Sequence, residues 1–81
     1  MAIIHYFGRF SDIADGGDVT LPQHVTDTDA LTRWLAEDNE RFAAEWRRPG
    51  APVVVNQEIA RGTHPIGQGD EIAFMSALSG G

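Results

Sequence analysis

One helical stretch, set between strand-forming regions, limits most strongly what this chain can fold into. Within residues 27–46, the apolar side chains of Leu31, Trp34 and Leu35 recur at the spacing of one helix face. The regions before and after it are made of strand-forming runs and turns. A single helical segment cannot cover both faces of a sheet. We therefore expect an α+β domain with the helix packed across one face of its sheet.

Signals at both ends bound this helical segment. Asp27 or Thr28 can cap its start, because short polar side chains accept hydrogen bonds from the free amides of a first turn. The pattern continues or restarts through Trp46, and the arginines, proline and glycine of residues 47–50 end it. Trp34 and Trp46 are interpreted as core residues, since large aromatic side chains at helical spacing mostly fill cores.

Strand-forming runs lie on both sides of the helix. They are rich in apolar, β-branched and aromatic residues and cover residues 2–7, 18–21, 52–56, 57–60 and 71–75. The first and last runs would lie side by side in the middle of a mixed sheet, joined through the helix by a right-handed crossover. This order predicts a ubiquitin-like β-grasp fold, although the spacing alone leaves a ferredoxin-like or another small α+β fold open. Residues 1–75 would form the domain, and residues 76–81 a flexible C-terminal Gly-Gly tail.

The composition argues against several classes of function. The 81 residues suffice for one small domain, and the absence of cysteine excludes disulfides, thiolate metal sites and cysteine nucleophiles. The chain has 12 acidic residues, 6 arginines and no lysine, which gives a net charge of -6. This balance argues against partners such as nucleic acids or anionic membranes and favours a basic protein partner. With no signal-peptide pattern and no apolar run of about 20 residues, the expected location is the cytoplasm.

The side chains contain no pattern typical of a catalytic or metal site. The three histidines are far apart in sequence, and none has a second ligand three or four residues away. The loop aspartates Asp12, Asp15 and Asp18 lack the glutamate of a calcium loop and are interpreted as solvated turn residues. The serines and threonines lack a nucleophile elbow, and the glycines do not form a phosphate-binding loop. We therefore expect no metal and no catalytic side chain.

The end of the sequence offers a different kind of chemistry. After the strand-like run that ends near Phe74, the side chains become small, and the chain closes with Gly80 and Gly81. Without a Cβ, these two residues can lie close to another protein's backbone and pass through a narrow channel. The tail from Met75 to Gly81 spans on the order of 20 Å when extended. The carboxylate of Gly81 could therefore be modified in a partner's active site.

Five segments together resemble a known family, the small, sulfur-carrying subunit of molybdopterin synthase, which belongs to the ubiquitin-like superfamily. The segments are Tyr6-Phe7-Gly8, Val55-Asn56-Gln57, His64-Pro65, Gly69-Asp70-Glu71-Ile72-Ala73-Phe74 and Ser79-Gly80-Gly81. The similarity covers essentially the whole chain, and the Gly-Asp-Glu strand and the Gly-Gly end at this spacing are its specific part.

The resemblance implies a non-catalytic carrier subunit of the synthase complex. A ubiquitin-activating-type adenylyltransferase would use ATP to join AMP to the Gly81 carboxylate, and a sulfur donor protein would displace AMP to leave a thiocarboxylate. The large subunit of the synthase would then receive the tail and pass the sulfur to cyclic pyranopterin monophosphate, where two deliveries build the molybdopterin dithiolene. The chain itself would bind no cofactor. The family also implies a heterotetramer of two small and two large subunits.

The resemblance also suggests roles for individual residues. Gly81 would carry the acyl adenylate and the thiocarboxylate, while Leu78, Ser79 and Gly80 would form the tail that threads the partner's channel. Ile59 and Met75, together with Leu78, could form a docking patch for partners, although ordinary core packing is an equal alternative for Ile59 and Met75. We expect Phe74, which should point to the opposite face from Met75, to lie in the core.

Two positions depart from the family's pattern. Ser76-Ala77 replace two prolines, so the start of the tail should be more mobile before docking, and Ser11 replaces an arginine in the first loop. Two other functions remain open: a sulfur carrier for thiamine thiazole, cysteine or another thiolated product, and a ubiquitin-like protein modifier. The length of the helical region, residues 27–46, favours the molybdopterin carrier over the thiamine carriers, which are shorter there.

Overall fold

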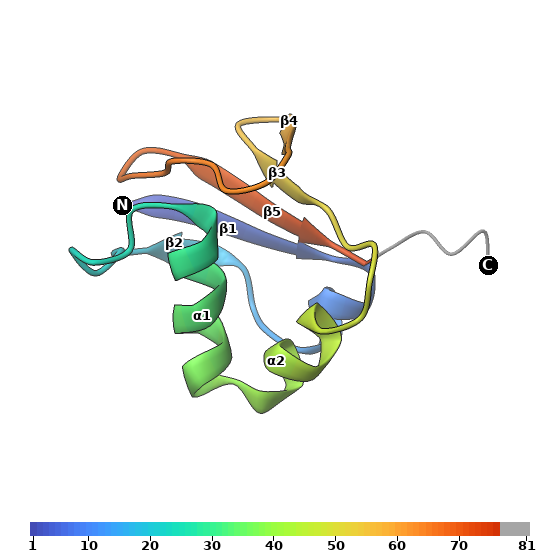
Figure 1. Cartoon of the computed structure of the whole chain (residues 1–81). Coiled ribbons are helices and arrows are strands. Elements are labelled where there is room, and N and C mark those ends of the chain that lie inside the picture. The colour runs from blue at the N-terminus through green and yellow to red at the C-terminus, as the bar shows by residue number, and fades with distance from the viewer. Residues whose placement is uncertain (77–81) are drawn as a thin grey trace.

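The computed structural model describes residues 1–76, and its centre is one mixed sheet of five strands (Figure 1). The strands are β1 (Ala2–Phe7), β2 (Gly17–Val19), β3 (Val53–Val55), β4 (Glu58–Ala60) and β5 (Glu71–Met75). Their order across the sheet is β2-β1-β5-β3-β4. The first and last strands therefore lie next to each other in the middle, as the strand pattern predicts.

The central pair β1 and β5 is parallel, whereas the outer pairs are antiparallel. Ile3 lies opposite Glu71, and the register continues to the pair Phe7 and Met75 at the other end of the two strands. β2 pairs with β1, β3 with β5, and β4 with β3, each in antiparallel orientation. The predicted bounds of β1 and β5 are confirmed. β2 begins and ends earlier than predicted, because Leu21 enters the core from a loop rather than from the strand.

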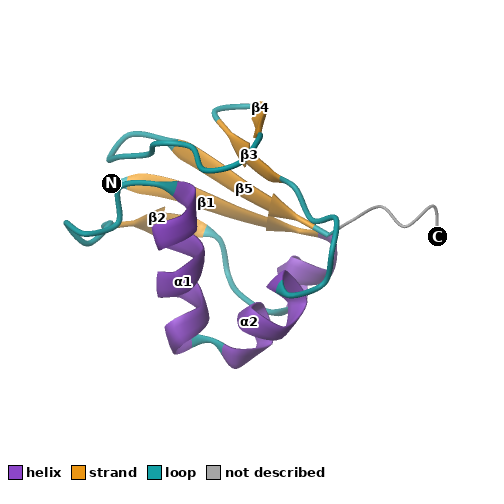
Figure 2. Ribbon diagram, in the orientation of Figure 1, coloured by secondary structure: helices purple, strands orange, loops and turns teal. Residues whose placement is uncertain are grey.

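Both α-helices lie on the same face of the sheet (Figure 2). α1 spans Thr28–Asp38 and α2 spans Glu40–Trp46, so the helical pattern restarts rather than continuing as one helix. Asp27 caps α1, with its Oδ1 accepting a hydrogen bond of 2.7 Å from the Ala30 amide. The predicted α+β arrangement with helical cover on one face is confirmed.

The break between the helices is caused by Asn39. Its backbone is extended, at φ -143° and ψ 100°, and its side-chain Oδ1 accepts a hydrogen bond of 3.0 Å from the Phe42 amide. Its Nδ2 also donates to the carbonyl of Ile13, at 3.2 Å, in the connection between β1 and β2. One side chain therefore caps α2 and ties the helical layer to this connection.

Aromatic rings fill the space between the sheet and the helices. Phe10, Phe42 and Phe74 are fully buried, and the rings of Phe42 and Phe74 meet edge to face with centroids 5.2 Å apart. Trp46 packs against both Phe42 and Phe74, and Trp34 packs against the edge of the same core. The prediction that Phe74 lies in the core is confirmed, and Trp34 and Trp46 are partly buried against that core.

The connection between β1 and β2 does more than join the two strands. Its first part forms a short 3-10 helix, η1 (Gly8–Asp12), which places Phe10 in the core at an exposed fraction of 0%. The ring of Phe10 lies 5.5 Å from that of Phe42 between centroids. The connection therefore forms part of the hydrophobic core and holds the end of β1 against α2.

Candidate functional site

The face of the sheet away from the helices presents an apolar surface at the end where β1 and β5 finish. Side chains alternate along β1, so Ile4 faces the helices while Phe7 faces outward. Phe7 and Met75 are direct neighbours in the parallel register and are 47% and 38% exposed. Because β5 leads directly to Ser76, this pair lies at the base of the C-terminal tail.

The apolar surface extends across the sheet to the edge strand β4. Ala73 lies opposite Val54, and Val54 lies opposite Ile59, so the three side chains share the outward face. Ile59 is 63% exposed, one of the most exposed large apolar side chains among residues 1–76. We call this surface the open-face patch, and it consists of the exposed Phe7, Ile59 and Met75, the half-buried Val54, and Ala73, which is buried at 9% exposure.

The exposure of Ile59 and Met75 argues against core packing for these two residues. Both point away from the core, so ordinary core packing does not account for either of them. A contiguous apolar surface on a small domain commonly marks a site of protein association. Their role in docking stays a prediction, now with a geometry in which both belong to one surface.

A polar pair adjoins the open-face patch. His5 Nε2 lies 3.1 Å from Glu71 Oε2, and the two side chains are 40% and 41% exposed. The His5 ring also stacks on Phe7, with centroids 5.9 Å apart. Sequence reasoning treated His5 in isolation and missed this pair. Outward alternation along β1 and β5 was the signal that could have found it, because it places His5 and Glu71 on one face.

The base of the tail is fixed to the first loop. The Ser76 Oγ accepts a hydrogen bond of 3.2 Å from the Arg9 amide. Gly8 adopts a positive φ of 61°, and a Cβ at this position would lie 2.1 Å from Ser76 Oγ. The prediction that Ser76-Ala77 make the start of the tail more mobile stays a prediction. At Ser76 the side-chain hydroxyl accepts a hydrogen bond, which a proline side chain could not do.

The remaining predicted tail residues lie outside the part of the chain that the structure describes. They are Ala77, Leu78, Ser79, Gly80 and Gly81. Their predicted roles in carrying sulfur and threading a channel therefore stay predictions.

Several residues that carry the family resemblance form a hydrogen-bond network at the start of β5. Asn56 and Gln57 adopt positive φ angles of 50° and 71° in the turn between β3 and β4. Asn56 Nδ2 donates to Asp70 Oδ1 at 3.1 Å, and Asn56 Oδ1 accepts from the Glu71 amide at 3.0 Å. These contacts join the β3-β4 turn to the central strand, so their role in this fold is positional.

Asp70 is the ionisable residue of this hydrogen-bond network. The hydrogen bond from Asn56 and a second one from the Gly67 amide, at 2.8 Å, lower the pKa of its carboxyl group below the ordinary value of 3.8. Both donors favour the ionised form. The negative charge of Asp70 therefore helps to hold the turn before β5 in place.

The described residues contain no cluster that could hold a metal ion. Within residues 1–76, no group of three or more histidine, aspartate or glutamate side chains is arranged to hold one. In the same part of the chain, neither α1 nor α2 is long and apolar enough to cross a membrane.

The central parallel pair β1 and β5, the helices on one face and the exposed apolar surface beside the last strand define a ubiquitin-like β-grasp protein. The chain belongs to the ThiS family, which it matches over residues 4–81. It is thus a ubiquitin-like sulfur carrier, and such carriers work with activating and partner enzymes. No curated protein matches the chain.

Proposed function

We propose that this chain is the sulfur carrier for molybdopterin synthesis. The observation that supports it best is the helical region, in which α1 (Thr28–Asp38) and α2 (Glu40–Trp46) follow each other with only Asn39 between them. A region of this length resembles the molybdopterin carriers more than the thiamine carriers. The five segments that resemble the small subunit of molybdopterin synthase give independent support.

The proposed chemistry takes place at Gly81. Its carboxylate attacks the α-phosphate of ATP in the activating enzyme, pyrophosphate leaves, and the acyl adenylate forms. A persulfide on a donor protein then attacks the activated carbonyl through its terminal sulfur, the acyl-phosphate bond breaks, and AMP leaves. A protein thiol next cleaves the S–S bond of the acyl disulfide, forms a disulfide with the donor's sulfur, and frees the thiocarboxylate. Adenylation is needed because an oxide is a poor leaving group and AMP a good one. The resulting thiocarboxylate holds sulfur in a form that the partner enzyme can transfer.

The described residues would hold the domain on its partners while Gly81 reacts. The open-face patch supplies apolar area beside the base of the tail, and burial of such area is the main source of affinity between proteins. The hydrogen bond between Ser76 Oγ and the Arg9 amide fixes where the tail leaves the domain. Docking on the patch would therefore aim residues 77–81 into the partner.

Loading of the tail can be tested by intact mass spectrometry. The chain is incubated with a ubiquitin-activating-type adenylyltransferase, ATP and a sulfur donor protein, and it should gain the mass difference between sulfur and oxygen. Deletion of Gly81 should abolish this gain without unfolding the domain, whereas Arg61→Ala, at an exposed position after β4, should load normally. A slower-migrating conjugate with a target protein in place of the mass gain would overturn the carrier and support a modifier.

The pathway that the chain serves is tested by offering the loaded chain two different sulfur acceptors. Loaded chain is mixed with the large subunit of molybdopterin synthase and cyclic pyranopterin monophosphate, and separately with a thiazole-forming system. Molybdopterin formation in the first mixture alone supports the proposal. Sulfur transfer in the second mixture alone would assign the chain to thiamine synthesis.

A further inference from the structure

A groove of about 370 Å³ lies on the surface between η1 and α2, on the side of the helices. Its lining consists of Arg9, Asp12, Ile13, Arg41, Ala44, Glu45 and Arg48. Arg41, Glu45 and Arg48 follow the spacing of one face of α2 and the residues just after it. The groove is therefore formed where the first loop meets the second helix.

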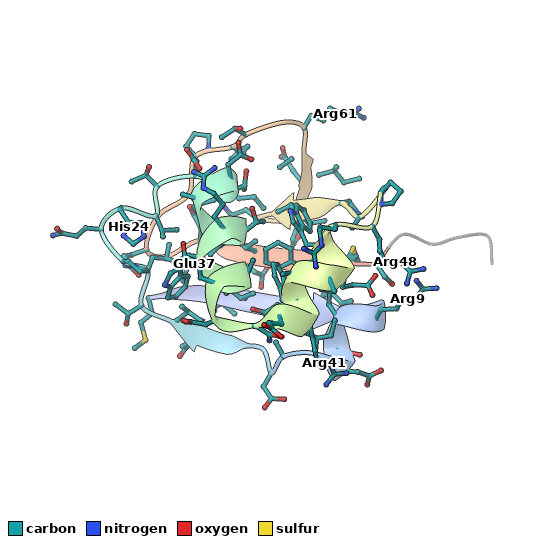
Figure 3. The ribbon with its side chains drawn as sticks, turned by 60° about the horizontal axis from the view of Figure 1, so that its bottom comes forward. Arg9, His24, Glu37, Arg41, Arg48 and Arg61 are labelled. Atoms are coloured by element: carbon teal, nitrogen blue, oxygen red, sulfur yellow. The ribbon has the colours of Figure 1, made fainter. Side chains whose placement is uncertain are left out.

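Positive charge is concentrated in this groove. It holds three of the chain's 6 arginines but only two of its 12 acidic residues, which gives a local net charge of +1 on a chain of net charge -6. Figure 3 shows Arg9 and Arg48 near each other, Arg41 on the same side of the molecule, and Arg61 at the opposite edge. The groove is thus a basic site on an otherwise acidic protein.

The arginines of the groove keep most of their hydrogen-bonding capacity. Arg48 Nε lies 3.8 Å from Glu45 Oε2, and the Arg48 side chain is still 59% exposed. Within residues 1–76, no carboxylate lies within 4.0 Å of the guanidinium of Arg9 or Arg41. Guanidinium groups bind carboxylates in pairs of parallel hydrogen bonds, so the groove can accept several carboxylates at once.

The groove also lies next to Ser76, where β5 leads into the tail. Arg9 contributes its side chain to the groove and its amide to the hydrogen bond with Ser76, the last described residue before the tail. Phe7, in the open-face patch, lies two residues before Arg9. The patch lies on the face of the sheet away from the helices and the groove on their side, so a protein that receives the tail would reach both by contacting both sides of this end of the domain.

We propose that the groove binds an acidic segment of the activating enzyme, and that this contact helps to place the tail for adenylation. The inference rests on the proposed function only in requiring that Gly81 be activated, and it holds for any downstream pathway. A nucleic acid is a poor occupant, because the remaining surface is strongly acidic and would repel its phosphates. A protein segment with only a few carboxylates carries far less negative charge than a nucleic acid backbone, so it meets less of that repulsion.

The test is the exchange of pyrophosphate into ATP, catalysed by the activating enzyme and dependent on the full-length carrier. Arg41→Glu should raise the KM for the carrier about tenfold or more with kcat unchanged, because the charge contributes to docking and not to the reacting atoms. Arg61→Glu changes the charge equally at an exposed position outside the groove and should leave KM within about twofold. Added salt should raise the wild-type KM and reduce the difference between wild type and Arg41→Glu.

Three further measurements decide the proposal. Circular dichroism establishes that both variants fold, and Arg41→Gln, a milder change, should raise KM to an intermediate value. Replacement of the enzyme's contacting acidic residue by arginine should restore docking of Arg41→Glu. Equal KM values for Arg41→Glu and Arg61→Glu would overturn the proposal, as would a loss confined to kcat, which would indicate a role toward the nucleotide. If docking follows these expectations but molybdopterin does not form, only the proposed pathway fails.

Discussion

Ser76 Oγ and the Arg9 amide are joined by a hydrogen bond of 3.2 Å, and the lack of a side chain at Gly8 makes room for it. The contact connects the end of β5 to the start of η1. It ties Ser76, the last described residue, to the loop that joins Phe7 of the open-face patch to Arg9 of the basic groove.

Gly8→Ala should destabilise the domain by about 1–2 kcal/mol from the left-handed backbone alone, with an added loss from the displaced Ser76 hydroxyl. Urea denaturation measures the change. Gly62→Ala is a matched control, because Gly62 has a similar φ of 70° but open space around it. A Gly8→Ala cost no larger than that of Gly62→Ala would show that the contact with Ser76 contributes nothing.

Met75→Asp should weaken binding to the partner enzyme by about tenfold or more, because a charge would be buried in an apolar interface. The free energy of unfolding should change little, since the side chain is 38% exposed. Ile3→Asp changes an equally exposed residue of the same face at the far end of β1 and should bind nearly normally. Isothermal titration calorimetry compares the two, and equal losses would argue against docking at the base of the tail.

Asn39→Ala should destabilise the fold by about 1 kcal/mol or more, because α2 loses its cap and the Ile13 carbonyl loses its donor. Thermal unfolding followed by circular dichroism measures the shift in Tm. Glu37→Ala, at an exposed position in α1, is the control and should change Tm little. An unchanged Tm for Asn39→Ala would show that the break between the helices does not depend on this side chain.

Asp70 should make the stability of the domain depend on pH in the acid range. Its pKa is lowered in the folded state, chiefly by the hydrogen bond from Asn56, so its contribution is complete above the unfolded value near 3.8. As pH falls below that value and through the folded pKa, the contribution is lost. Denaturation at several pH values should show that the free energy of unfolding falls less steeply with decreasing pH for Asp70→Asn than for the wild type. Asp15→Asn, in an exposed loop, should keep the wild-type slope, and identical slopes for all three proteins would contradict this role.

The main elements of the fold were predictable because their signals are local. The runs of apolar, β-branched and aromatic residues at 2–7 and 71–75 predicted the central strands with their correct bounds, and Asp27 was among the expected caps of α1. Phe10 was missed because one apolar residue in a polar loop has no period. Asn39 was missed as the cause of the helix break, although an asparagine three residues before Phe42 is a local capping signal. Only its second contact, with Ile13, depends on a residue 26 positions away.

The candidate site was predictable only in part. The alternation in β5 separated Phe74 from Met75, and exposure now places Ile59 and Met75 on one surface. The pair of His5 and Glu71 was not predicted, because its members are 66 residues apart and meet only through strand pairing. The basic groove was not predicted for the same reason, since its two sides come from separate segments of the chain.

The central claim is that the thiocarboxylate of Gly81 supplies the sulfur of the molybdopterin dithiolene. Its most direct test is a single-turnover reaction of loaded full-length chain, the large subunit of molybdopterin synthase and cyclic pyranopterin monophosphate. Intact mass spectrometry follows the chain while chromatography measures molybdopterin. The account predicts that two loaded chains return to the carboxylate form for each molybdopterin produced. Loaded chains that keep their sulfur, or molybdopterin that forms equally well with the Gly81 deletion, would contradict it.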